Sequence, residues 1–137
     1  MKRLFLTLTA LMTMAAAPSF ACDCTPDTDG TQARALIADQ NYALAQVFVR
    51  GMNIRNGQSM LDNKKPIVGG LLAPNIRAHF GHGDCATTPH YKQTQTMLIH
   101  FEPDGTYAIM GQCETKALTQ YLQAHPEAAA GTTPGGE

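Results

Sequence analysis

The spacing of apolar residues along the chain predicts β-strands in its middle part. The run at 44–50 is rich in β-forming residues and stops at a glycine. Residues 75–80 and 95–102 alternate between apolar and polar positions, as half-buried strands do. A Pro-Asp-Gly turn at 103–105 leads into another strand at 106–111, which together predict a hairpin with a short loop.

The phase of this alternation predicts which side chains face the core. The residues expected inside are Val47, Val49, Ile76, Phe80, Met97, Ile99 and Phe101. In the strand at 95–102, the side chains expected to point outward are Thr96, Leu98 and His100. Apolar residues at helical spacing predict helices at 31–40 and 114–124, which pack over the sheet through Leu36, Ile37, Leu118 and Leu122.

Two parts of the chain give no clear element. Residues 53–70 contain an Asn-Gly turn signal at 56–57, a Lys-Lys-Pro break at 64–66 and a glycine pair, with room for one short strand. A barrel needs strands here, so residues 52–74 are the widest gap in the prediction. The C-terminal residues 125–137 lack apolar side chains able to pack, and we expect a disordered tail.

The N-terminus has the features of a secretory signal peptide. Two basic residues precede an apolar stretch at 4–17 that is too short to span a bilayer, and small residues at 19 and 21 suit a cleavage site. We therefore expect residues 1–21 to be removed. Cys22 then becomes the first residue of an exported, periplasmic or secreted domain over 22–124.

Several kinds of attachment and partner are disfavoured. Lipidation of Cys22 is not expected, because Ser19 and Phe20 depart from the residues that a lipoprotein signal carries at these positions. No stretch after the leader reaches membrane length. The formal net charge of −1 becomes more negative once the two basic residues of the leader are removed, which argues against nucleic acid and anionic membranes as partners.

The four cysteines predict two disulfides, since the export signal directs the chain to an oxidising compartment. A bond between Cys22 and Cys24 would close a very tight ring, which disulfide geometry disfavours. Two pairings remain open: Cys22–Cys85 with Cys24–Cys113, or the crossed alternative. With no free thiol nucleophile, no Ser-His-Asp arrangement on identifiable elements and no phosphate-binding loop, the sequence indicates a protein that is not an enzyme and needs no cofactor.

The cysteines and strands follow one another in an order that is typical of a known family. The matching segments are Cys22-Asp23-Cys24, VFVRG at 47–51, Cys85 and MLIHFEPDGTYAIMGQC at 97–113. Together they resemble the netrin-like domain of the tissue inhibitors of metalloproteinases, over about residues 22–122. The resemblance implies an all-β fold, a five-stranded OB-type barrel with flanking helices. It also implies the pairs Cys22–Cys85 and Cys24–Cys113.

The resemblance further implies a protein-binding function, with a metalloprotease as the candidate partner. In the inhibitors, the α-amine and carbonyl of the first cysteine chelate the catalytic zinc of the protease, and the next side chain enters its pocket. Cys22 would supply these atoms here and Asp23 would enter the pocket, where the family usually has Thr or Ser. The competing interpretation is that Cys22 and Cys24 only staple the N-terminus across the barrel.

The histidines support an alternative function, metal binding in the periplasm. His79, His82 and His90 lie close together in the sequence, and histidine is a common ligand of copper and zinc. Two observations argue against a site there: His79 falls on the outward face of its predicted strand, and the glycines around His82 are explained by a loop.

Overall fold

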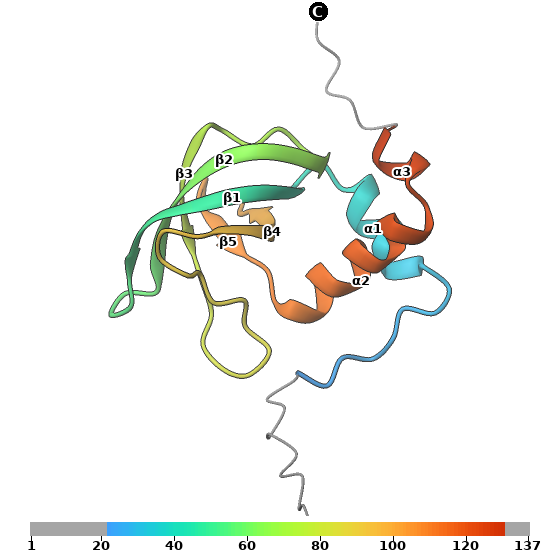
Figure 1. Cartoon of the computed structure of the whole chain (residues 1–137), viewed down its shortest axis with the longest axis horizontal. Coiled ribbons are helices and arrows are strands. Elements are labelled where there is room, and N and C mark those ends of the chain that lie inside the picture. Colours follow the sequence, from blue (N-terminus) through green and yellow to red (C-terminus); the bar gives the residue numbers. More distant parts are fainter. Residues whose placement is uncertain (1–21, 131–137) are drawn as a thin grey trace, which may run out of the picture.

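The computed structural model describes residues 22–130, in which five strands form a closed barrel (Figure 1). The strands are β1 (Tyr42–Asn53), β2 (Gln58–Gly69), β3 (Asn75–His79), β4 (Thr94–Phe101) and β5 (Tyr107–Ile109). Their order around the barrel is β1-β2-β3-β5-β4, and β4 pairs with β1 to close it. All pairings are antiparallel except that of β3 with β5. The predicted OB-type barrel is therefore confirmed.

Three helices accompany the barrel and gather on one side of it (Figure 1). They are α1 (Thr31–Ala38), α2 (Gln112–Ala124) and α3 (Glu127–Ala130). Helices were predicted at the first two places, whereas the short α3 lies inside the range predicted as a disordered tail. None of the helices within 22–130 is long and apolar enough to cross a membrane. The predicted leader, 1–21, and the end of the tail lie outside the described residues.

The barrel interior contains most of the predicted core. Buried there are Val47, Val49, Ile76, Phe80, Met97 and Ile99, while Phe101 is half-buried and packs against them. A second apolar cluster lies between the barrel wall and the helices. Leu118 is fully buried in it, and the other three predicted helix residues are half-buried against it: Leu36, Ile37 and Leu122.

Leu98 points outward from β4, as predicted, but it is not exposed to solvent. It lies between Met97 and Ile99, which point into the barrel, and so its side chain points to the outer face. That face is covered by the helices, and Leu98 is fully buried among Leu44, Val68 and Leu118. Alternation along a strand predicts which face a side chain is on. It does not predict whether helices cover that face, as they do here.

The strand β2 is much longer than the one short strand that the sequence allowed for in residues 53–70. The Asn-Gly pair at 56–57 makes the turn from β1 as expected, with Gly57 at a φ of 63°. The Lys-Lys-Pro run at 64–66, however, lies inside β2 and does not end it. Pairing with β3 stops at Asp62, and the backbone N–H of Asn63 still donates to the carbonyl of Pro74. The rest of β2 pairs with β1 only. Lysine and proline are tolerated on such a free edge, because no neighbouring strand needs the missing N–H.

Two disulfides tie the segment before α1 to the rest of the domain. Residues 22–27 have no regular secondary structure. Cys22 is bonded to Cys85 in the loop between β3 and β4, and Cys24 is bonded to Cys113 in the first turn of α2. Of the two pairings that the spacing of the cysteines left open, this is the one that the family resemblance implies.

We expect Leu98→Ala to lower the free energy of unfolding by about 2–5 kcal/mol, because it opens a cavity between β4 and the helices. Leu71 is 77% exposed, so Leu71→Ala is a matched control that should change stability by no more than about 0.5 kcal/mol. Urea unfolding followed by circular dichroism measures both values. Equal losses in the two variants would show that the helices do not cover Leu98.

Peptide mapping of the oxidised protein without reductant should recover Cys22 linked to Cys85 and Cys24 linked to Cys113. The bonds span 63 and 89 residues, and the chain-entropy model assigns about 4 kcal/mol of stability to each loop of this size. Replacing either pair with serine should therefore lower the unfolding midpoint strongly. Recovery of the crossed peptides would contradict the structure.

Candidate functional site: the disulfide-bonded N-terminus

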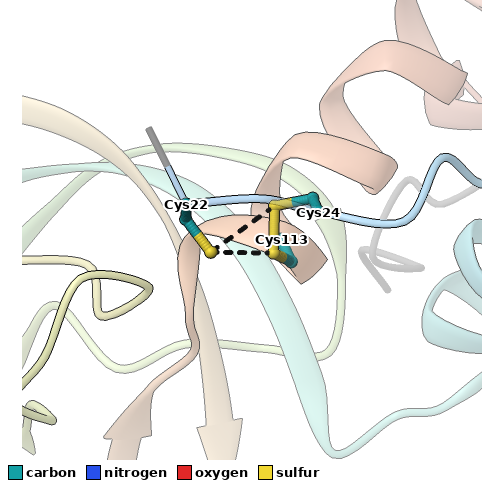
Figure 2. Close-up of side chains that lie close together, drawn as sticks. All are labelled: Cys22, Cys24 and Cys113. Atoms are coloured by element: carbon teal, nitrogen blue, oxygen red, sulfur yellow. Dashed lines mark hydrogen bonds between the residues drawn. A yellow bond between two sulfur atoms is a disulfide. The ribbon is translucent and has the colours of Figure 1, made fainter. Parts of the chain in front are cut away.

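The two disulfides lie against each other at the start of α2 (Figure 2). The Sγ atom of Cys22 is 3.2 Å from that of Cys113 and 3.8 Å from that of Cys24. Sulfur atoms in disulfides carry no hydrogen, so the dashed lines in Figure 2 mark contacts between sulfurs and not hydrogen bonds. Cys85 is bonded to Cys22, and all four cysteines therefore meet in one cluster.

Hydrogen bonds also hold the loop that carries Cys85 to the start of α2. The backbone N–H of Gln112 donates to the carbonyl of Cys85 at 2.8 Å, and the side-chain amide of Gln112 donates to the carbonyl of Ala86 at 2.9 Å. Gly111 allows this close approach, since a Cβ atom there would lie 3.0 Å from the Cys85 carbonyl oxygen. The loop and the helix thus have contacts that do not depend on a disulfide.

Asp27 fixes the other end of the N-terminal segment to α1. One of its carboxylate oxygens accepts the backbone N–H of Gln32 at 3.2 Å, and the other accepts that of Ala33 at 2.9 Å. N–H groups in the first turn of a helix have no partner within the helix, so Asp27 caps α1. Since Ala33 is buried in the cluster that also contains Leu118 of α2, this cap links the segment to both helices.

Asp23 is the part of this site that faces solvent. Its side chain is exposed, while the cysteines on both sides of it are half-buried. Within residues 22–130 its carboxylate makes no hydrogen bond or ion pair. The segment from Cys22 to Cys24 therefore presents an unpaired negative charge between two points of covalent attachment.

The three histidines of the predicted metal site are not brought together. His79 ends β3, His82 and His90 lie in the following loop, and all three are exposed. The ring of His82 instead packs edge-on against Phe80. Among the described residues, the group of potential metal ligands whose atoms converge consists of cysteines, at positions 22, 24 and 113. The histidine alternative therefore has no support from the geometry.

Two exposed carboxyl groups have altered acidity, and local turns explain both. The pKa of Asp29 is lowered because its carboxylate accepts the backbone N–H of Thr31. The pKa of Asp104 is lowered chiefly because the hydroxyl of Thr106 donates to it at 2.6 Å. These interactions stabilise the entry to α1 and the turn between β4 and β5, and they indicate no acid–base pair.

An apolar pocket of about 270 Å³ lies between β1, β2 and the residues that follow β2. Its lining contains Leu44, Val68, Leu72 and Ala129 but no titratable side chain. The side-chain oxygen of Asn63 at its wall is buried and has no hydrogen-bond partner among the described residues. This pocket offers no group for covalent or acid–base chemistry, so the N-terminus is the better candidate site.

Comparisons with known proteins do not assign the chain to a family. No protein-family model, curated protein or solved structure matches it. The resemblance to the netrin-like domain therefore stays a prediction from the sequence.

Proposed function

We propose that this chain is an exported protein-binding module of the netrin-like type, with the segment from Cys22 to Cys24 as its binding surface. The observation that supports this most is the attachment of both cysteines beside Asp23, one to the β3–β4 loop and one to α2. A segment held at two neighbouring points loses little conformational freedom on binding. Less of the contact energy is therefore offset by the entropy cost of ordering the segment, and binding is tighter.

The candidate partner is a secreted zinc metalloprotease. The catalytic zinc of such an enzyme keeps one coordination position open for water. After removal of residues 1–21, the α-amine and the carbonyl oxygen of Cys22 become two adjacent ligands that can displace this water. An α-amine has an ordinary pKa of about 7.7–8.0, so a useful fraction is neutral and able to coordinate near neutral pH.

Asp23 then sets the kind of pocket that the partner must offer. A carboxylate without a partner in its own protein is costly to transfer into an apolar pocket. It is better accommodated by a pocket with a basic side chain or with backbone N–H donors. We therefore expect selectivity for proteases whose pocket next to the zinc is polar or basic.

The first test changes the position of the α-amine. A protein that starts at Cys22 should inhibit a sensitive member of a panel of secreted zinc metalloproteases, and an added alanine before Cys22 should weaken inhibition about a hundredfold or more. The amine is then displaced from the zinc, while the disulfides and the core are unchanged. Cleavage of a fluorogenic peptide measures the inhibition.

Circular dichroism and peptide mapping of both proteins serve as the control that the fold and the disulfides are the same. Equal inhibition by the two forms would exclude chelation by the amine. If the form that starts at Cys22 inhibits none of the proteases, the cysteines serve only as a staple and the proposed activity is wrong.

The second test replaces Asp23. Asp23→Thr should strengthen binding to a metalloprotease with an apolar pocket by about tenfold or more, because no charge has to be desolvated. Glu127→Gln removes the same charge from an exposed side chain on the distant helix α3, and it should leave the affinity unchanged. Equal gains in both variants would mean that net charge, and not the pocket contact, controls binding.

A further inference from the structure

The turn between β1 and β2, at the end of the barrel away from the helices, borders a hollow on the outer surface (Figure 1). Gln58 and Met60 flank the buried Ser59 on β2, so their side chains point to the outer face. The strand register places Met60 between Gly51 of β1 and Arg77 of β3. The hollow has a volume of about 310 Å³, and its lining consists of Met52, Asn53, Asn56, Gln58, Met60 and Arg77.

The three side-chain amides in this hollow already have their oxygens bonded. Oδ1 of Asn53 accepts the backbone N–H of Arg55 at 3.1 Å, and Oδ1 of Asn56 accepts that of Gln58 at 3.2 Å. A backbone N–H can only donate, so these bonds fix which atom of each amide is the oxygen. The nitrogen of Asn56 in turn donates to Oε1 of Gln58 at 3.4 Å. Within residues 22–130, the side-chain N–H groups of Asn53 and Gln58 have no partner, and the hollow therefore offers donors.

Arg77 adds a positive charge to these donors. Its side chain is exposed, and its guanidinium makes no hydrogen bond or ion pair in the part of the chain that the structure describes. It is also the one charged residue in the lining of the hollow. The carboxylate of Asp62, two residues along β2 from Met60, is bonded to Arg50 at 3.2 Å, so its charge is compensated. The hollow thus combines free N–H donors with one unpaired cation.

The surroundings of the hollow are basic, although the chain as a whole has a formal net charge of −1. Residues 40–79 contain the first three strands, and Asp62 is the one acidic residue among them. The basic residues of the same range are Arg50, Arg55, Lys64, Lys65 and Arg77. The net charge, which argues against nucleic acid and anionic membranes, therefore does not exclude a small anion at this face of the barrel.

We propose that this hollow binds a small organic acid through its carboxylate. An ionised carboxylate only accepts hydrogen bonds, and its two oxygens match two N–H groups of the Arg77 guanidinium. Its single negative charge balances the single positive charge in the lining, and the amides of Asn53 and Gln58 supply further donors. The side chains of Met52 and Met60 give the remainder of the ligand an apolar and adaptable surface. Binding here does not depend on the disulfide-bonded N-terminus.

The experiment titrates the oxidised protein, residues 22–137, with glucuronate at constant ionic strength and follows it by ¹H–¹⁵N NMR. Glucose, which has a hydroxymethyl group in place of the carboxylate, is the matched neutral probe. Glucuronate should shift the side-chain amide signals of Asn53 and Gln58 until they saturate, and glucose should not. Arg77→Gln should weaken binding about tenfold or more, because a hydrogen bond between charged groups is lost. Arg34→Gln removes the same charge from an exposed position in α1 and should bind like the parent.

Gln58→Leu tests the amide donors without a change of charge, and it should weaken glucuronate binding about threefold or more. The backbone amide signals of each variant show whether the barrel is intact. N-acetylglutamate amide serves as a second acid: binding as tight as that of glucuronate would show that the carboxylate is recognised whatever carries it, and weaker binding would identify a sugar acid. Absence of saturable shifts with both acids would overturn the proposal. So would equal shifts with glucose, or an equal loss in Arg34→Gln, which would assign the effect to net charge.

Discussion

The two disulfides that meet at the start of α2 join three parts of the domain covalently. One disulfide joins the N-terminal segment to the β3–β4 loop, and the other joins it to α2. The helix α2 in turn covers the outer face of the barrel through Leu118. A domain of this size buries only a modest core, so covalent links that span 63 and 89 residues carry a large share of its stability.

The sequence predicts those strands in which apolar and polar residues alternate. β3 and β4 have this pattern, a turn signal joins β4 to β5, and the structure confirms these strands. β2 lacks this pattern. The part of β2 that contains the Lys-Lys-Pro run at 64–66 is a free edge, where lysine and proline are tolerated, so its residues do not alternate. Leu98 shows the other limit, since its burial depends on helices that are distant in the sequence.

The sequence also predicted only part of the candidate site, because much of the site depends on contacts between residues that are distant in the sequence. The Cys-x-Cys pair stands out in the sequence, but its geometry leaves two pairings open, and only the family resemblance distinguished them. The roles of Gln112 and Asp27 could not be predicted, because their partners are backbone groups brought near by the fold. The histidines are neighbours in sequence. In the structure they lie at the end of a strand and in a loop, and they do not form a site.

Two covalent anchors flank the exposed Asp23, and we expect them to hold its backbone rigid. Backbone ¹⁵N relaxation of the oxidised protein that starts at Cys22 measures this rigidity. We expect an order parameter of about 0.85 for the Asp23 amide, the value typical of a rigid backbone. A value below about 0.6, with the barrel strands still rigid, would show that the terminus is flexible despite its two disulfides.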